Sequence, residues 1–333
     1  MEISVVTAVY NGDEYLGESI ESILKQTFRD FEYIIVNDGS NDQTKEILDN
    51  VTDPRVKVIH LEKNSGAANA LNVGVNEAKG KWIALQDADD ISIVHRLEKQ
   101  LQYIKSDSKL VAVGSLIKCI TGNTQVDKKS LEREETFFNS KEQFRNYQFS
   151  STPICHGSGF FLKKAFKIIG GYDPKFNIAY DCNLWTRMFE VGEISRVPEV
   201  LYKYRVHGNS LSHSNRIKRS KELILSIFKS ISELRFKHLK TKPNLLLFGT
   251  VRTFEFYKKH IEHENHYLMV SLPDREPGNV KKAYSLYCSN KLDGIIIGSN
   301  RNIGRQLRFL ERKGLSLGNN LFRILIPRTI QEE

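Results

Sequence analysis

The sequence ISVVTAVYNGDEYLGESIESILKQ, residues 3–26, is a short apolar run followed by a segment whose apolar residues recur with the period of a helix. The same pair of patterns follows as EYIIVND with TKEILDN, VKVIH with AANALNVGVNEA, and KWIALQD with IVHRLEKQLQYI, before LVAVGS at residues 110–115. Short apolar runs of this kind are typical of buried strands. The alternation predicts an α/β fold, with helices on both faces of a mostly parallel sheet and ligands at the carboxyl ends of its strands.

The chain of 333 residues is longer than one typical domain. We expect a first domain at residues 1–212 and a basic helical linker at residues 213–241. Strand-like and helix-like segments alternate again at residues 242–333, which predicts a smaller accessory α/β region of Rossmann-like type. Because only Gly249 marks its first turn and the pattern G-x-G-x-x-G is absent, this region is expected to be degenerate.

Charge is distributed unevenly between these parts. From residue 213 onward the chain has 23 Lys and Arg against 11 Asp and Glu, whereas the first 212 residues have 26 against 29. The net charge of +9 therefore comes entirely from the C-terminal part. Such a distribution suits an anionic partner such as a membrane surface or a lipid diphosphate, and a solvated helical surface explains it equally well.

Several classes of protein are disfavoured by composition. Hydrophobic residues make up 40% of the chain and charged residues 27%, which is typical of a globular protein and not of a disordered one. The chain enters its first strand without an apolar leader, so a cytoplasmic location is expected. The cysteines are widely spaced and lack a C-x-x-C pair, which predicts reduced thiols: Cys119, Cys155, Cys182 and Cys288.

An acidic segment, Gln86-Asp87-Ala88-Asp89-Asp90, follows the fourth expected strand. Alternate side chains of an extended segment point the same way, so Asp87 and Asp89 can converge at the carboxyl edge of the sheet. Two carboxylates there suit Mg²⁺ or Mn²⁺, which take their remaining ligands from diphosphate oxygens and water. The alternative is a solvated acidic turn that caps the next helix.

Polar residues also follow the second expected strand. The Asp38 carboxylate could accept a hydrogen bond from a pyrimidine N–H, although Asp38-Gly39 is also an ordinary turn sequence. Ser40 and Gln43 have the spacing of a capping box for the next helix.

The later part of the first domain contains four further candidates. Asp181 precedes an apolar helical segment, where a carboxylate can cap the helix and also serve as a general base. Arg205 and His207 could clamp a diphosphate, and His207 could bind the metal, or both could be surface residues. His156 could face the sugar or the acceptor, or simply belong to a glycine-rich turn.

His260, His263 and His266 recur every three residues in a charged, helix-like segment. No conventional zinc spacing is completed there, so a solvated surface is the expected explanation.

Residues 3 to about 212 resemble the catalytic domain of glycosyltransferase family 2, which has a nucleotide-binding α/β sandwich called the GT-A fold. The matching segments, in order, are VVTAVYNGDEYLGESIESILKQT, YIIVNDGSND, NSGAANALNVGVNEAKGKWIALQDADD, GGYDP, AYDCNLWTRM and YKYRVH. Each segment alone is a weak signal, and their occurrence together in this order is specific.

The resemblance implies how a nucleotide would be bound. Thr7, Val9 and Tyr10 would line the base pocket, and Asp38 would contact the base, which is usually uracil in this family. Asp87 would lie near the ribose.

The resemblance also implies that Asp89 reaches the metal and that Asp181 is the catalytic base. The chain departs from the family where acidic residues are common, at Tyr180 and Asn183, and where arginine is common, at Leu71. These departures leave the base in place and make the substrate harder to infer.

The resemblance predicts an inverting transferase of the hexosyl or N-acetylhexosaminyl type. It would move a sugar from a nucleoside-diphosphate sugar, usually a UDP-sugar, to a hydroxyl of a glycan or lipid-linked acceptor in cell-envelope or polysaccharide biosynthesis, with Mn²⁺ or Mg²⁺ as cofactor. It would work in the cytoplasm, at the inner face of the membrane.

Two alternatives belong to other classes. One is a catalytically silent module that binds nucleotide sugars. The other is a sugar-phosphate nucleotidyltransferase, which the absence of Lys and Arg from VYNGDEYLGES disfavours. Nucleic acid is not expected as a partner, because the aromatic and glycine signatures of RNA-binding modules are absent.

Overall fold

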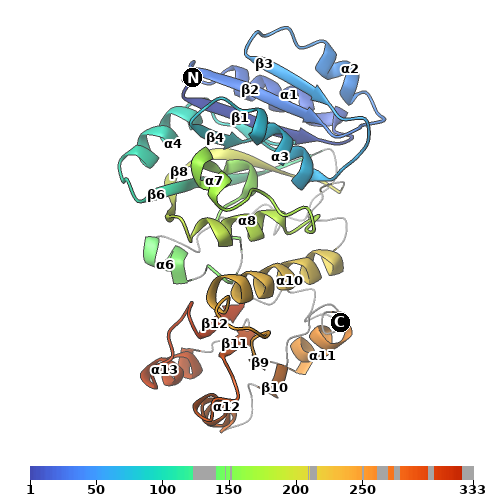
Figure 1. The fold of residues 1–333 in the computed structure, drawn as a ribbon. Helices are drawn as coiled ribbons and strands as arrows, with labels where there is room; N and C mark the ends of the chain where they lie inside the picture. Colours follow the sequence, from blue (N-terminus) through green and yellow to red (C-terminus); the bar gives the residue numbers. More distant parts are fainter. Residues whose placement is uncertain are drawn as a thin grey trace. The chain divides into compact units, whose positions relative to one another are not determined.

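The computed structural model describes the chain except for residues 123–139, 147, 151, 209, 211–215, 250, 261–268, 274–277, 299–303 and 325–333. The chain divides into two compact units, drawn in Figure 1. The first unit combines Met1–Phe144 with Pro153–Ser214, and the second combines Arg145–Thr152 with Asn215–Glu333.

The first unit is built on one large sheet. Its strands are β1 Ile3–Val9, β2 Phe31–Asn37, β3 Val56–His60, β4 Trp82–Leu85, β5 Ile91–Ser92, β6 Leu110–Thr121, β7 Phe160–Leu162 and β8 Glu193–Val206. Within the described residues their order is β3-β2-β1-β4-β7-β6-β8-β5. The pairs among β1 to β4 and the pair β6 with β8 are parallel, whereas β7 and β5 run antiparallel to their neighbours. The expected mostly parallel sheet is confirmed.

Helices cover both faces of this sheet (Figure 1). They include α1 Asp13–Leu24, α2 Thr44–Asp49, α3 Ala67–Glu77 and α4 Arg96–Lys105. Val5 of β1 belongs to a buried cluster with Leu16 of α1 and Leu97 of α4. On the other face, α3 lies so close to β1 that a Cβ at Gly74 would be 2.6 Å from Val6. Successive apolar residues of β1 thus face opposite helix layers, because neighbouring strand residues point to opposite sides.

The expected capping box at Ser40 and Gln43 is wrong. α2 begins at Thr44, and the side chain of Gln43, the residue at the cap position, makes no capping hydrogen bond. Instead, Asp42 Oδ1 accepts a hydrogen bond from the Thr44 N–H, at 3.0 Å. Ser40 Oγ accepts one from the Asn11 N–H in a neighbouring loop, so a tertiary contact has replaced the local cap.

The remaining helices of the region up to residue 188 are short. They are α6 Lys141–Asn146, the 3-10 turn η1 His156–Ser158, α7 Lys163–Ile168 and α8 Tyr180–Met188. Leu184, Trp185 and Met188 have no exposed surface, so one side of α8 is anchored firmly in the core.

The second unit is a smaller α/β structure. It contains the helices α10 Arg216–Arg235, α11 Val251–His260, α12 Asn279–Cys288 and α13 Gly304–Arg312, and the strands β9 Leu245–Gly249, β10 Met269–Pro273, β11 Gly294–Gly298 and β12 Leu321–Ile324. Its described sheet has the order β10-β9-β11-β12, and every pair in it is parallel. Phe248, Ile295 and Leu310 lie in its core. The expected C-terminal α/β region is confirmed, and β12 is an element that the sequence patterns missed.

None of the helices in the described part of the chain is both long and apolar enough to cross a lipid bilayer. The side chains of His260, His263 and His266 lie outside the described residues, so the expectation of a solvated surface there stays a prediction.

Candidate active site

The candidate residues gather at one edge of the first unit's sheet. β1 pairs in parallel with β2, where Val9 lies opposite Asn37, and with β4, where Val6 lies opposite Leu85. The carboxyl ends of these strands therefore meet. This arrangement brings the loops after β1, β2 and β4 together, as the sequence predicted.

Gln86 and Arg96 hold the acidic turn after β4. The Gln86 amide donates hydrogen bonds to the carbonyl oxygens of Asp87 and Asp90, at 3.1 and 2.8 Å. The fully buried Arg96 guanidinium donates to Gln86 Oε1 at 3.2 Å and to the Leu85 carbonyl at 2.7 Å. Burial lowers the pKa of Arg96, and nearby negative groups, Asp87 among them, oppose that effect. The turn is therefore fixed from inside the core.

Sequence reasoning did not single out Arg96, and it gave Gln86 no role of its own within the acidic segment. A signal for Arg96 was present, because it belongs to the buried face of α4 together with Leu97, Leu101 and Ile104. A charged residue on the apolar face of a helix usually has a specific set of partners.

Asp87 is held by His156. His156 Nδ1 lies 2.9 Å from Asp87 Oδ1, and His156 Nε2 lies 3.0 Å from the Tyr172 hydroxyl. The Asp87 N–H donates to the Tyr202 hydroxyl oxygen. Burial acts most strongly on the pKa of His156 and lowers it, but Asp87, by its charge and hydrogen bond, and Asp181 together raise that pKa overall. Both ring nitrogens of His156 thus have protein partners.

Asp89 is paired with His207. His207 Nε2 lies 2.8 Å from Asp89 Oδ2, and the Arg205 Nε–H donates to the Asp89 carbonyl at 2.7 Å. Arg205 also forms an ion pair of 2.6 Å with Glu18, and its guanidinium lies over the Tyr15 ring. Arg205 therefore joins the acidic turn to α1.

Asp90 is the buried member of the acidic turn. Its Oδ1 accepts a hydrogen bond from the Arg205 N–H at 2.6 Å. Burial and, after it, the charges of Asp89 and Asp87 raise the pKa of Asp90 well above its ordinary value. Asp90 links the turn to the end of β8.

Asp38 fastens the start of α3. Its Oδ1 accepts from the N–H and the hydroxyl of Ser65, and its Oδ2 accepts from the Gly66 N–H, all at 2.8 Å. The turn beside it depends on Gly39, which has φ of +69° and where a Cβ would lie 2.6 Å from the Lys63 backbone. Asp38 is almost fully buried, and the loop before α3 already uses both of its oxygens.

The first strand contributes residues of very different exposure. Thr7 is fully buried and donates to the Gln86 carbonyl at 2.7 Å, and its hydroxyl lies 3.0 Å from that of Tyr33. Val9 is buried, whereas Tyr10 is 45% exposed. Of these residues, Tyr10 has by far the most surface available to a ligand.

Asp181 lies in the first turn of α8. The residue at the cap position is Ala179, and Asp181 Oδ1 accepts a hydrogen bond from the Cys182 N–H at 2.7 Å. Burial raises the pKa of the Tyr180 phenol well above its ordinary value, and the charges of Asp87, Asp181 and Asp89 raise it further. The Tyr180 ring lies edge-on to the His156 imidazole, with centroids 5.2 Å apart, so the residue before Asp181 packs against the histidine that holds Asp87.

Within the described residues, no group of three or more His, Cys, Asp or Glu side chains is arranged to hold a metal ion. The Asp89 carboxylate and the His207 imidazole, however, lie side by side. Mn²⁺ and Mg²⁺ need few protein ligands when substrate oxygens complete the shell. The pair fits an ion shared with a diphosphate and does not form a closed protein cage.

Comparison with known proteins decides the family. The sequence model of the family "Glycosyl transferase family 2" matches residues 4–169 of this chain. An uncharacterized glycosyltransferase of Methanocaldococcus jannaschii is 35% identical over 224 residues, which cover 66% of this chain and 75% of that protein. This chain belongs to glycosyltransferase family 2.

Solved structures show that this family 2 chain has the GT-A fold. Staphylococcus aureus TarS 1–349, solved in complex with UDP-GlcNAc, aligns with a TM-score of 0.55 at 22% identity, covering 72% of this chain and 69% of TarS. Mannosyltransferase PcManGT from Pyrobaculum calidifontis, in complex with GDP-Man and Mn²⁺, aligns with a TM-score of 0.53 at 18% identity, covering 95% and 81%. The chain is therefore a glycosyltransferase by family, and its fold is GT-A.

Proposed function

We propose that this glycosyltransferase moves a hexosyl or N-acetylhexosaminyl group from a nucleoside-diphosphate sugar, most simply a UDP-sugar, to an acceptor hydroxyl with inversion. The observation that carries the proposal is that His156, which lies 2.9 Å from Asp87 at the carboxyl edge of the sheet, packs edge-on against Tyr180, the residue directly before Asp181. A nucleotide and a base for the acceptor can therefore meet at one point.

In this proposal Asp181 is the catalytic base. Its carboxylate removes the proton of the acceptor hydroxyl, which attacks the anomeric carbon from the face opposite the leaving group. One carboxylate is enough, in contrast to glycoside hydrolysis, in which two flank the bond. The position of Asp181 at the start of a buried helix holds the base in a fixed orientation.

The nucleotide would lie over the ends of β1, β2 and β4. Tyr10 offers a ring to the base, and Val9 forms the floor beside it. Asp38 would accept a pyrimidine N–H through the lone pairs that Ser65 and Gly66 leave, once the loop before α3 opens to the base, and Asp87 would face the ribose. Thr7 does not contact the nucleotide in this proposal. Its hydrogen bond to the Gln86 carbonyl, inside the core, holds β1 against the start of the acidic turn.

The pair Asp89 and His207 would hold the divalent ion, Mn²⁺ or Mg²⁺, whose chemistry is to neutralise the departing nucleoside diphosphate. Arg205 keeps the turn that carries Asp89 in place. His156 has both ring nitrogens engaged, so we assign the sugar and acceptor contacts to other residues.

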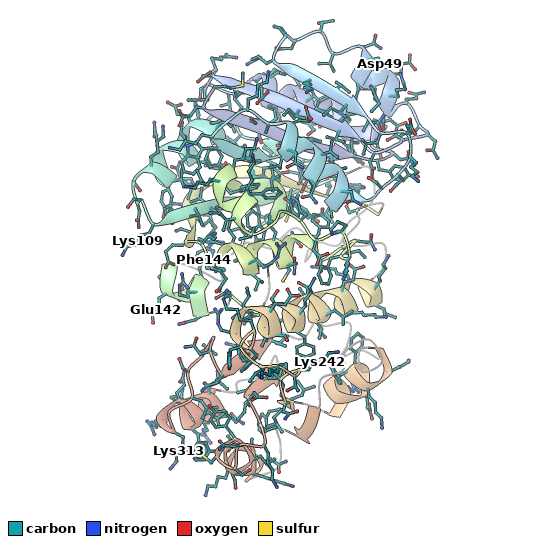
Figure 2. The ribbon with its side chains drawn as sticks, viewed as in Figure 1. Asp49, Lys109, Glu142, Phe144, Lys242 and Lys313 are labelled. Atoms are coloured by element: carbon teal, nitrogen blue, oxygen red, sulfur yellow. The ribbon has the colours of Figure 1, made fainter. Side chains whose placement is uncertain are left out.

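We propose that residues 1–212 are the catalytic domain, that residues 213–241 are a basic linker and that residues 242–333 are an accessory domain. In this proposal the linker and the accessory domain serve a glycan or lipid-linked acceptor at the inner face of the cytoplasmic membrane. Arg305, Arg308 and Arg312 are exposed on α13, and Lys313 follows them, as labelled in Figure 2. This cationic surface suits anionic lipid head groups. Changing the three arginines to glutamate should reduce co-sedimentation with anionic vesicles at low salt.

The test of the function is a donor screen in Mn²⁺ with UDP-glucose, UDP-GlcNAc and GDP-mannose, in which release of the nucleoside diphosphate is measured. Asp181→Asn should lower kcat by about a hundredfold or more and leave donor binding intact. Asp49→Asn is the control, because Asp49 is exposed at the end of α2 (Figure 2). Binding of donors without release by the wild type would support the silent module instead, and unchanged turnover in Asp181→Asn would remove Asp181 from its role.

A further inference from the structure

A chain of hydrogen bonds connects Asp87 to the loop that precedes α8. It begins at Asn72 of α3, whose amide makes two bonds to the backbone of Tyr172. Asn72 Nδ2 donates to the Tyr172 carbonyl, and Asn72 Oδ1 accepts from the Tyr172 N–H, both at 2.9 Å. Two bonds to one residue fix its orientation as well as its position.

Glycine allows this close approach. Gly171 has φ of +74°, and a Cβ there would lie 2.7 Å from Asn72 Oδ1. A side chain at this position would therefore push Asn72 away, and the positive φ would be strained as well.

The same loop is tied to the helix that carries Asp181. The Arg187 guanidinium of α8 donates to the carbonyls of Ile169 and Gly171, at 2.6 and 2.7 Å. Its Nε–H also donates to Asn183 within α8, at 2.9 Å. The loop and α8 therefore form one rigid piece, and the position of Tyr172 is coupled to that of Asp181.

From Tyr172 the chain continues to the acidic turn. The Tyr172 hydroxyl lies 3.0 Å from His156 Nε2, and His156 Nδ1 lies 2.9 Å from Asp87 Oδ1. The neighbouring Gly157 packs against the same carboxylate, because a Cβ there would be 2.6 Å from Asp87 Oδ2. The Tyr180 ring lies edge-on to the imidazole, with centroids 5.2 Å apart.

The chain works in either protonation state of the imidazole. A hydroxyl can donate to a neutral Nε2 or accept from a protonated one, so Nδ1–H remains directed at Asp87 in both cases. His156 is only 9% exposed, which keeps water from competing for these bonds.

We propose that Asn72, Tyr172 and His156 form a positioning network that fixes the Asp87 carboxylate relative to Asp181. This inference rests on the proposed function, since Asp87 and Asp181 are there the nucleotide and base carboxylates. Neither His156 nor Tyr172 touches the substrate in this scheme. Their contribution is to keep two distant parts of the site in register before the donor arrives, which reduces the cost of orienting the reactants.

Tyr172→Phe is the decisive variant, because it removes the one hydroxyl that joins Tyr172 to His156 and keeps the ring. We expect kcat/KM for donor turnover to fall by about fivefold, the effect of one lost hydrogen bond. Tyr103→Phe is the matched control: it removes a comparable bond, 3.2 Å to Ser195, elsewhere in the first unit, and should leave kcat/KM within about twofold of the wild type.

Variants of His156 test whether His156 and Tyr172 act on Asp87 through one chain of hydrogen bonds. His156→Ala should lower kcat/KM by about fiftyfold, within the range seen for residues that orient a functional group. His156→Asn should recover part of this loss, because its amide N–H can replace Nδ1–H. In the His156→Ala background, Tyr172→Phe should have no further effect, since the two residues act in one chain.

A readout without turnover separates this inference from the proposed function. In the full-length protein labelled with ¹⁵N-histidine, His156 Nδ1 should carry a proton protected from exchange, and Tyr172→Phe should shift the Nε2 resonance. An enzyme that turns over its donor with equal kcat/KM in wild type and Tyr172→Phe, or with additive losses in the double variant, would overturn the network. Absence of turnover with every donor would instead count against the proposed function, while the NMR signals would still report the network.

Discussion

His207 Nε2 lies 2.8 Å from Asp89 Oδ2, and this contact joins residues that are 118 positions apart in the sequence. His207 follows β8, which pairs in parallel with β6 and antiparallel to β5. The side chain is packed against the ring of Tyr15, with ring centroids 5.0 Å apart. The pair is therefore held in place by three separate segments before any ion binds.

This pair predicts how activity depends on metal. His207→Ala should raise the Mn²⁺ concentration needed for half-maximal turnover by at least about tenfold, because one of the two proposed protein ligands is lost. Turnover should be measured across a Mn²⁺ titration after treatment with EDTA. His95→Ala, which changes an exposed histidine bonded to Thr27, should keep the wild-type curve. Identical curves for wild type and His207→Ala would exclude this residue as a ligand.

The acidic turn should be intolerant of a methyl group at Gly157. A Cβ there would lie 2.0 Å from the Tyr202 hydroxyl and 2.6 Å from Asp87 Oδ2, so Gly157→Ala must displace both groups or the backbone of residue 157. We expect a loss of stability of about 1–3 kcal/mol together with weaker UDP binding, measured by urea denaturation and calorimetry.

Gly17 provides the matched control for this substitution. It lies within α1 and has nothing within 4 Å of its Cβ position. Gly17→Ala should therefore stabilise the protein by about 0.5–1 kcal/mol, because alanine loses less backbone entropy in a helix. Equal effects at the two positions would contradict the close contact at Gly157.

Arg96 should be required for folding of the first unit. Its guanidinium satisfies the carbonyl of Leu85 and the side chains of Gln86 and Ser92, all of them buried. Arg96→Leu removes the guanidinium donors from the Leu85 carbonyl and Ser92 Oγ, and leaves Gln86 Oε1 with only the Ser92 hydroxyl among these partners. We expect a loss of at least about 3 kcal/mol in the free energy of unfolding.

The comparison for Arg96 is Arg29→Leu. Arg29 is exposed and makes a single bond of 3.3 Å to the Leu24 carbonyl, so its replacement should change the unfolding free energy by about 0.5 kcal/mol or less. Similar denaturation midpoints for the two variants would show that the buried contacts of Arg96 contribute little.

Asp53 predicts one component of the pH dependence of stability. The side-chain hydrogen bond from Arg55 lowers the pKa of Asp53 to about 2, with further help from the Arg55 backbone N–H. A carboxyl whose folded pKa is depressed stabilises the protein above its unfolded pKa of about 3.9, and this stabilisation disappears as the pH falls toward 2.

The free energy of unfolding of the wild type should therefore exceed that of Asp53→Asn by about 1 kcal/mol at pH 5, and by much less at pH 2.5. The difference at pH 5 is small because the ion pair of Asp53 with Arg55 is partly exposed. Urea denaturation at both pH values measures the difference. If the difference in unfolding free energy is as large at pH 2.5 as at pH 5, the ion pair is not the cause of that difference.

The sequence by itself determined the alternation of strands and helices from β1 to β4 and the edge of the sheet at which the candidate residues meet. Hydrophobic periodicity is a local property, so β1 to β4 and their helices could be predicted from short windows. Parallel pairing then brings Asp38, Asp87 and Asp89 to one edge, because these residues follow the carboxyl ends of neighbouring strands.

Only the tertiary structure decided which groups hold these carboxylates. Asn72 meets Tyr172 across 100 positions, and His156 meets Asp87 across 69, distances along the chain at which no periodic pattern carries information. The capping box failed for the same reason, because Ser40 found a partner in a neighbouring loop. A buried polar side chain takes whichever partner packing brings within hydrogen-bond reach, and packing is a property of the whole fold.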